Sequence, residues 1–335
     1  MMGLLSMRSI NRSRGRGFFV GVKACVGVLL VLGAAEMAAR RWLPQDALTY
    51  RDSDNPRLGV ELLPGASGMK AGAAVSINAD GLRQDPLPTP KPEHERRVVV
   101  AGGQETFGLG VDESKTFVRV AESGLEALGR VRTVNLSMYS YNLAQKVELV
   151  CEKLPRIQPE VVVLQASDHD SGGLPQGALN APHLKNWLRG HSALARRAAE
   201  AHYLRPMHGS ALPTAASHDA DKEATAAQEQ LRRFQDCVKR LGAFGAVMMI
   251  SDPAGDGAVS GVARGLRTEA EKLGLPYIDA GPAIRRLPQA ERTLGPASRF
   301  LSPAAHRATA HELHRILKPL LHRRKAMTPP TRPSS

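Results

Sequence analysis

The feature that most constrains the fold is a short apolar run that ends in two glycines. Residues 97–101 read Arg-Val-Val-Val-Ala, and Gly102 and Gly103 follow them. A run this rich in β-branched residues, closed by turn residues, predicts a buried strand that ends in a tight turn. In open α/β sheets, ligand sites lie at the carboxyl ends of the strands. We therefore expect a site where this strand ends, at Gly102, Gly103 and Gln104.

Strand-like and helix-like segments alternate along the chain from residue 96 onward. The predicted strands are 97–101, 131–135, 161–165, 243–250 and 276–279, and the predicted helices are 116–128, 143–154, 222–241, 258–273 and about 303–322. This alternation is typical of an α/β fold with a flavodoxin-like, doubly wound parallel sheet of five strands. A long insertion, residues 171–220, interrupts the alternation, and a helix is expected to open at Trp187.

The N-terminal segment predicts a membrane anchor. Residues from Gly17 to Ala35 are apolar except for Lys23, and about 20 such residues cross a bilayer. Arginines precede the run, so the positive-inside rule places the N-terminus in the cytoplasm and the following chain outside. A cleaved signal peptide, cut near the small residues at 33–35, is the alternative. We expect an uncleaved, single-pass transmembrane helix.

The remaining segments complete a predicted domain organisation. Residues 42–95 are rich in Pro, Gly and Asp and contain short alternating pieces, which predicts a small β extension followed by a Pro-rich linker at 85–92. The end of the chain is basic and contains several prolines, which predicts a disordered tail. The expected parts are a basic tail (1–16), an anchor (17–41), the extension and linker (42–95), an α/β domain (96–322) and the disordered tail (323–335).

Charge and cysteine content exclude several classes of function. The formal net charge is +13, but much of the basic excess lies at the two ends of the chain, and aromatic residues make up only 4%. Without aromatic-basic interleaving or zinc-knuckle spacing, nucleic-acid binding is not expected. The three cysteines, Cys25, Cys151 and Cys237, have no metal-binding or redox spacing. Cys151 and Cys237 could pair in an oxidising compartment, but buried free thiols are the simpler interpretation.

Several short segments, taken in order, resemble the blocks of the SGNH/GDSL hydrolases. In that family the first strand ends in Gly-Asp-Ser, and residues 97–104 have the same strand-and-turn shape. Segments 134–142, 163–170 and 301–307 resemble the second, third and fifth blocks. Segment 78–83, Asn-Ala-Asp-Gly-Leu-Arg, is similar to the Asn-x-x-Gly-Phe-Arg that precedes strand one in membrane-anchored bacterial members, although alone it would be an ordinary turn. The resemblance covers about residues 75–321 and implies an SGNH hydrolase-like fold.

The same resemblance implies that the catalytic residues are replaced. Active members use a serine nucleophile, a histidine base and an aspartate that orients it. Gln104 stands at the serine position, Phe300 at the histidine position and Ala297 at the aspartate position. A primary amide cannot be activated for acyl transfer, and a phenyl ring cannot take a proton. His306 matches a family histidine that begins the last helix and is expected to be structural.

The family's oxyanion positions fall at Ser140 and His169. Asp168, His169 and Asp170 could together bind a metal or act as acid and base, but a solvated polar turn is the more common role for such a run. We predict no metal and no cofactor. The predicted binding cleft comprises Gly102, Gly103, Gln104, Ser140, Asp168, His169 and Asp170.

These expectations converge on a function by resemblance. Membrane-anchored members of this kind edit acyl groups on cell-surface polysaccharide, which implies a bacterial inner-membrane protein with its domain in the periplasm and a carbohydrate or acylated glycan as ligand. We expect a pseudoenzyme that acts as a binding or scaffold component. One alternative is an active esterase or O-acyltransferase that uses non-standard residues. The other is a structural partner of an envelope complex, with the insertion 171–220 as its contact surface.

Overall fold

The computed structural model describes residues 7–42, 46–168, 170, 182–198, 220–253, 258–295 and 298–327. The chain divides into two compact units. The smaller unit holds residues 1–45 and 184–203, and the larger unit holds residues 46–183 and 204–335.

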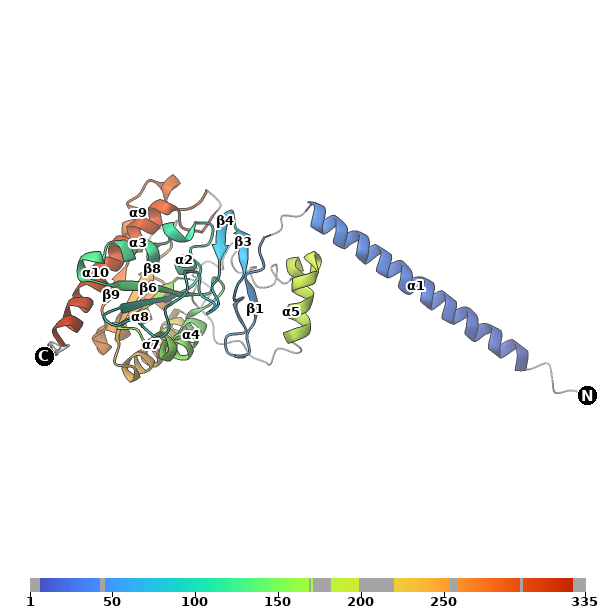
Figure 1. Ribbon diagram of the computed structural model, residues 1–335, viewed down its shortest axis with the longest axis horizontal. Helices are drawn as coiled ribbons and strands as arrows, with labels where there is room; N and C mark the ends of the chain where they lie inside the picture. Colours follow the sequence, from blue (N-terminus) through green and yellow to red (C-terminus); the bar gives the residue numbers. More distant parts are fainter. Residues whose placement is uncertain are drawn as a thin grey trace, which may run out of the picture. The chain divides into compact units, whose positions relative to one another are not determined.

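A five-stranded parallel sheet forms the centre of the larger unit (Figure 1). Its strands are β5 (Arg96–Gly102), β6 (Val131–Ser137), β7 (Val161–Ser167), β8 (Phe244–Ile250) and β9 (Tyr277–Asp279). Their spatial order is β6-β5-β7-β8-β9, and all neighbouring pairs are parallel. This is the flavodoxin-like order, as predicted, and it places the topological switch point between β5 and β7.

Helices cover both faces of the sheet (Figure 1). One layer contains α3 (Phe117–Ser123), α9 (Gly281–Arg285) and α10 (Pro303–Met327), and the other contains α4 (Leu143–Ile157), α7 (Ala220–Arg240) and α8 (Gly261–Leu273). Alternate strand residues point to opposite faces. Val98, Val100, Val161 and Val163 therefore pack in one core cluster with Phe117 of α3 and leucines of α10.

The predicted strands and helices of this unit are present, with shifted ends. β6 and β7 run beyond the predicted ends at 135 and 165, because both stay paired with their neighbours to their last residues. The helix predicted at 116–128 is interrupted at Gly124, where a Cβ atom would lie 2.1 Å from the ring of His314 on α10. α10 continues to Met327, so the predicted end at residue 322 was too early. Residues 328–335 of the predicted tail lie outside the described residues.

Two antiparallel hairpins form the predicted β extension. β1 (Tyr50–Asp52) pairs with β2 (Val60–Leu62), and β3 (Ser67–Lys70) pairs with β4 (Ala73–Ser76). Both hairpins belong to the same compact unit as the parallel sheet.

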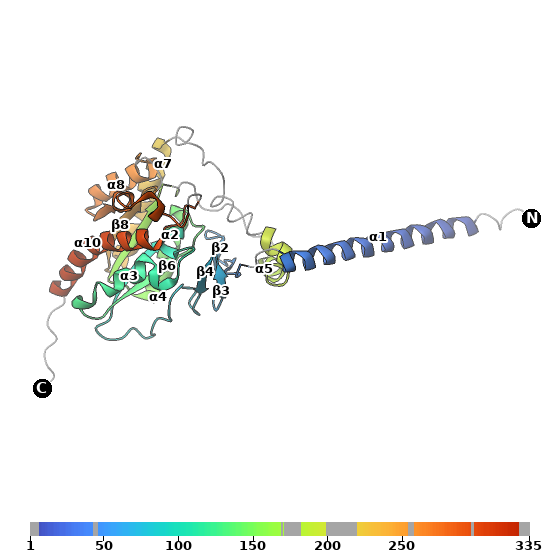
Figure 2. The same ribbon diagram turned by 90° about the horizontal axis from the view of Figure 1, so that it is seen from above.

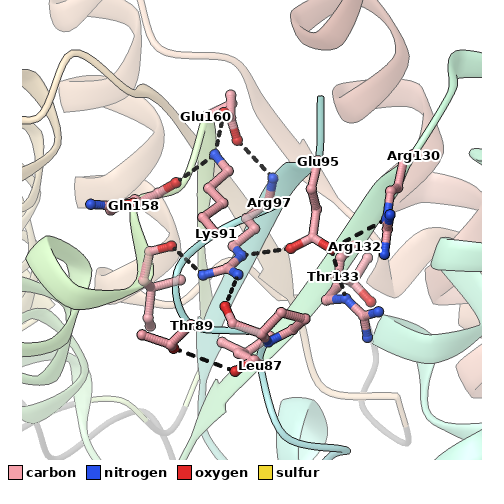
Figure 3. Close-up of polar contacts among 12 residues, drawn as sticks. Leu87, Thr89, Lys91, Glu95, Arg97, Arg130, Arg132, Thr133, Gln158 and Glu160 are labelled. Carbon is pink, nitrogen blue, oxygen red and sulfur yellow. Dashed lines mark hydrogen bonds and ion pairs between the residues drawn. The ribbon is translucent and has the colours of Figure 1, made fainter. Parts of the chain in front are cut away.

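A buried ion cluster lies at the amino ends of the strands (Figure 3). The side chain of Arg97 is only 2% exposed and donates to the carboxylate of Glu95 at 2.8 Å. Its other nitrogens donate to the carbonyl oxygens of Ile157 at 3.1 Å and Pro88 at 2.6 Å. The second oxygen of Glu95 lies 3.4 Å from the Nε of Arg132.

A second ion pair at the amino ends of the strands holds the linker before β5 against the sheet (Figure 3). Lys91 lies 2.5 Å from the carboxylate of Glu160 and donates to the carbonyl oxygen of Gln158 at 2.9 Å. Glu160 also accepts the backbone N–H of Arg97 at 2.7 Å. The Pro-rich linker is therefore bonded to the amino edge of the sheet.

A disulfide between Cys151 and Cys237 joins α4 to α7, with a Cα–Cα distance of 5.4 Å. This corrects the interpretation of these residues as free thiols. The two cysteines are 86 positions apart in sequence, so the fold brings them together where local patterns could not. Cys25, the remaining cysteine, is free.

The smaller unit contains α1 (Met7–Trp42), α5 (Pro182–His191) and a short helix at 193–198. Within α1, Val22–Trp42 has a mean hydropathy of 1.9 and is long and apolar enough to cross a membrane. A signal sequence would have the same length and apolar composition. The helix predicted to open at Trp187 instead begins at Pro182 and ends at His191. It ends there because Ser192 caps the next helix, accepting the N–H of Ala195 at 3.0 Å.

Candidate functional site

The turn after β5 lies at the switch point of the sheet, where the sequence predicts a site. α2 (Gln104–Phe107) follows the strand immediately. A Cβ atom on Gly102 would lie 1.9 Å from the hydroxyl of Thr106 and 2.5 Å from Oε1 of Gln165, so only glycine fits. A Cβ atom on Gly103 would lie 3.1 Å from the Nζ of Lys146. The chain therefore turns tightly against side chains from α4 and β7.

Beneath this turn lies a buried cluster of one ammonium and two carboxyl groups. The side chain of Lys146 is 1% exposed, and its Nζ donates to Asp170 at 2.5 Å. The same oxygen of Asp170 accepts the N–H of Ser167 at 2.8 Å. Glu105 is buried as well. Burial raises the pKa of its carboxyl group and the charge of Asp170 adds to this, while the charge of Lys146 opposes it.

Sequence reasoning missed Lys146 and Glu105 as members of the site. A signal existed for the lysine, because it lies three residues after Leu143 and four before Val150, within the apolar stripe of the predicted helix. A lysine on such a stripe is seldom buried without a partner. The sequence could have flagged Lys146 but not the carboxylate that it contacts.

Gln165 of β7 holds the turn in place. It is fully buried, and its Oε1 accepts the N–H of Gly103 at 3.1 Å and the hydroxyl of Thr106 at 3.0 Å. Its Nε2 has no hydrogen-bond partner within the described part of the chain. Asn135 of β6 donates to the carbonyl oxygen of Thr106 at 2.8 Å. Amide side chains from both neighbouring strands thus fix the first turn of α2.

Gln104 and Ser140 both follow carboxyl strand ends, as predicted. Gln104 is half-buried, and its amide donates to Glu105 at 3.3 Å. Ser140 is half-buried in the turn after β6, just before Asn142, whose side chain caps α4. The backbone N–H of Met138 donates to the carbonyl oxygen of Gly102 at 3.3 Å, so the two turns start side by side.

The residues after β7 separate instead of forming one cluster. Asp170 turns inward to Lys146, whereas Asp168 accepts the N–H of Asp252, beyond β8, at 2.6 Å. His169 lies outside the described residues. Across the described ranges, no group of three His, Cys, Asp or Glu residues is arranged to hold a metal ion.

The loop before α10 carries the positions that the SGNH/GDSL resemblance assigns to the histidine and the aspartate of the triad. Phe300 is half-buried, and its carbonyl oxygen accepts the N–H of Leu294 at 2.9 Å. Ala297 lies outside the described residues. His306 is 1% exposed, stacks on the ring of Phe117 and accepts that residue's N–H at 3.2 Å. Burial lowers the pKa of His306 to about 3, so this histidine is a neutral packing residue, as expected.

The Asn78–Arg83 segment supports the site from the other side of α2. Asn78 accepts the N–H groups of Asp80 and Leu82, each at 2.9 Å, and shapes the turn. Arg83 is fully buried and donates to the carbonyl oxygens of Phe107 at 2.7 Å and Gly108 at 2.6 Å. Burial lowers its pKa to about 10. The segment therefore holds the C-terminal end of α2 in place. Its sequence, which resembles an ordinary turn, did not predict this role.

Comparison with known proteins finds similarity in fold. No family model and no curated protein matches the sequence. Among solved structures, TesA is 16% identical over 67% of this chain and 99% of its own, with a TM-score of 0.46. The esterase EstA from Pseudoalteromonas sp. is 13% identical over 68% and 99%, with a TM-score of 0.43.

A lipase/acylhydrolase from Enterococcus faecalis is 14% identical over 67% of this chain and 96% of its own, with a TM-score of 0.42. Two further solved structures that are similar in fold are described as lipolytic proteins of the G-D-S-L family. At these identities and scores the likeness says nothing of activity.

Proposed function

We propose that this chain is a single-pass membrane protein whose α/β domain binds an acylated glycan without cleaving it. In this proposal it serves as a binding or scaffold component of envelope polysaccharide processing. The ligand class comes from the SGNH/GDSL resemblance of the sequence, and the loss of cleavage comes from the chemistry of the site.

The observation that carries the proposal is the filling of the site beneath Gln104. Where an ester hydrolase needs a hydroxyl beside an imidazole, the turn offers an amide. The space behind Gly103 is occupied by Lys146, which is already paired with Asp170. The histidines with described side chains lie in the linker before β5, on α5 and on α10, whereas the site is built from the ends of β5, β6 and β7.

The half-buried side chains of Gln104 and Ser140 suit a neutral, hydrogen-bonding ligand. The Gln104 amide can donate and accept, and the Ser140 hydroxyl can do the same. Sugar hydroxyls and acyl carbonyls need such partners, and polar groups placed in a crevice at a switch point commonly orient a ligand.

An active ester hydrolase would need an activated hydroxyl, and the hydroxyl groups of Thr106 and Ser137 beside the turn are not activated. Thr106 donates its hydroxyl to Gln165, and Ser137 donates its hydroxyl to Asn135. An amide oxygen cannot take the proton that a nucleophilic hydroxyl must lose. These contacts favour the binding function.

Binding is tested with the full chain in lipid nanodiscs, using acetylated and matched deacetylated oligosaccharides as probes in ligand-observed NMR. We expect the acetylated probe to bind and Gln104→Ala and Ser140→Ala to weaken it, with Gln289→Ala, on an exposed residue, as the matched control. Absence of binding to both probes, or equal binding by all variants, would contradict the proposal. Absence of binding together with recovery of a stable envelope complex would favour the structural-partner alternative.

Localisation forms a separate part of the proposal: a bacterial inner membrane, with the α/β domain in the periplasm. The apolar α1 and the Cys151–Cys237 disulfide support it, since disulfides persist in oxidising compartments. In intact spheroplasts, added protease should degrade the α/β domain and leave α1 protected. Protection of the α/β domain would reverse the orientation, and loss of residues 1–35 from the mature chain would favour a cleaved signal peptide.

A further inference from the structure

The insertion after β7 returns to the membrane helix and is bonded to it. The segment concerned, residues 182–198, contains α5 and the helix 193–198 and is called the arm below. The carboxylate of Glu36 on α1 accepts the hydroxyl of Ser192 at 2.9 Å and the N–H groups of Ala193 at 2.7 Å and Leu194 at 3.2 Å. The two N–H groups are donors that a helix leaves unpaired at its first turn. Glu36 therefore caps the second helix of the arm.

Arg40 completes the attachment. It donates to the carboxylate of Glu36 at 2.7 Å and to the carbonyl oxygen of His191, the last residue of α5, at 2.5 Å. One helical turn of α1 thus holds the junction between the two helices of the arm. Figures 1 and 2 both show α5 beside the C-terminal end of α1.

The position of Glu36 along α1 fixes the depth of the arm. Glu36 directly follows the apolar run that ends at Ala35 and lies within Val22–Trp42. Helix residues rise about 1.5 Å each, so Trp42 lies only about 9 Å beyond Glu36. Each headgroup layer of a bilayer is about 5–8 Å deep. If α1 crosses a membrane, the junction of the arm must lie at headgroup level.

The exposure of α1 changes at the same position. Residues 22–34 are exposed, whereas Ala35, Glu36 and Ala38 are half-buried and Ala39 is buried. The bare part of the helix is the part that would face lipid, and protein covers it only after the apolar run ends.

The arm presents the side chains that favour a membrane interface. Trp187 is 57% exposed and Leu188 is 40% exposed. The ring of Trp187 stacks on that of His191 at 4.7 Å. On the second helix Arg197 is exposed, and Arg196 is half-buried and donates to the carbonyl oxygens of Arg189 at 3.3 Å and Gly190 at 3.5 Å. Tryptophan is enriched at headgroup level, and arginines there attract anionic lipids.

We propose that the arm is a second membrane-contacting element, which binds the phospholipid headgroup layer on the exported side of the membrane that α1 crosses. Trp187 and Leu188 enter the layer, and Arg196 and Arg197 favour anionic phospholipid. The inference rests on the anchor in the proposed function and is independent of any glycan.

The chain contains two tryptophans, which makes a direct test possible. Trp42→Phe leaves Trp187 as the single fluorophore, and Trp187→Phe leaves Trp42 as the internal reference. The full chain is reconstituted in vesicles of phosphatidylcholine with phosphatidylglycerol, brominated close to the headgroup. We expect the emission of Trp187 to be quenched to an extent comparable with that of Trp42.

Quenching of Trp42 without quenching of Trp187 would overturn the arm proposal and leave the anchor intact. If neither tryptophan is quenched and the chain does not float with the vesicles, the anchor itself is wrong. Glu36→Ala should reduce quenching of Trp187 and leave that of Trp42 unchanged, with the exposed Glu93→Ala as the control. Unchanged Trp187 quenching in Glu36→Ala would overturn attachment through Glu36.

Replacing Arg196 and Arg197 with Gln tests the lipid preference. Quenching of Trp187 should then no longer depend on phosphatidylglycerol. A dependence equal to that of the unmodified chain would overturn the role of these arginines.

Discussion

Both edges of the parallel sheet bury charged side chains, but the two clusters are balanced differently. At the amino edge, three nitrogens of Arg97 have acceptors, and Glu95 faces Arg132 as well. Although burial alone would raise the pKa of Glu95, the hydrogen bonds and charges of these arginines hold it below its ordinary value. At the carboxyl edge, Lys146 is the one cation that the described residues place against both Asp170 and Glu105, and the pKa of Glu105 is raised.

The difference suits a structural role for the first cluster and agrees with the proposed ligand site beside the second. A cluster whose members all have partners stabilises a fixed arrangement, here the attachment of the linker to β5. A cluster with surplus carboxyl groups at a switch point is typical of sites that bind ligands or protons. The four stability predictions below probe this contrast, from the largest expected effect to the smallest.

Arg97→Met should lower the free energy of unfolding by about 4 kcal/mol, because it leaves Glu95 and two carbonyl groups buried with fewer partners. Denaturant titration of the full chain in detergent measures this. Arg130→Met is the matched control, since Arg130 is 61% exposed and 3.6 Å from the same carboxylate. Equal losses of unfolding free energy in the two variants would contradict the claim that Arg97 stabilises the fold through its buried contacts.

Lys146→Met should cost about 3 kcal/mol, because it leaves the carboxylate of Asp170 buried without its cation. The loss is smaller than at Arg97, since the raised pKa of Glu105 lets one carboxyl group take up a proton. The double variant Lys146→Met with Asp170→Leu should regain part of the loss, and Lys153→Met, on a more exposed lysine of α4, should have little effect. A double variant less stable than Lys146→Met would contradict the ion-pair account.

Glu105→Gln should stabilise the protein by about 1 kcal/mol at pH 7, because it leaves one cation with one carboxylate. The folded state raises the pKa of Glu105 above its ordinary value of 4.5, so it binds the proton more tightly than the unfolded state. Stability from this group is therefore highest below pH 4.5 and falls as the pH rises through the raised pKa.

The stabilising effect of Glu105→Gln should accordingly vanish in acid. Urea titrations across the pH range test this, with the exposed Glu126→Gln as control. An effect that grows as the pH falls would contradict the sign of the shift.

Gln104→Ala should change the free energy of unfolding by less than about 0.5 kcal/mol, because the side chain is half-buried and makes one long hydrogen bond. It should nevertheless weaken glycan binding. Thermal melting alongside the NMR titration separates the two effects, and a large loss of stability would assign Gln104 to the structural framework.

The sequence predicted the elements better than the contacts between them. Patterns of β-branched residues and of helical spacing located the five strands and the helices around them, since both are local properties. The Lys146–Asp170 pair, the disulfide and the bond from Glu36 to Ser192 each join residues far apart in sequence. Only the topology of the sheet and its insertion decides which of these side chains meet.

The turn of the candidate site could be predicted because it too is a local property, whereas its role in binding stays a prediction. The glycines after β5 mark a tight turn in sequence, so Gly102, Gly103 and Gln104 could be named. Arg83 could be noticed only by resemblance, because its partners are carbonyl groups, which leave no trace in side-chain patterns. Asp168 and Asp170 looked like one polar turn, yet they serve different neighbours because β7 ends between α4 and the loop after β8.

The most direct test of the central claim is the hydrolysis of a generic acetyl ester by the full chain. It is measured beside the triple variant Gln104→Ser, Ala297→Asp, Phe300→His and beside heat-inactivated protein. We predict that the unmodified chain is no faster than the inactivated control, while the triple variant turns over the ester, if slowly. Turnover by the unmodified chain above the heat-inactivated control would contradict the claim that this domain binds without cleaving.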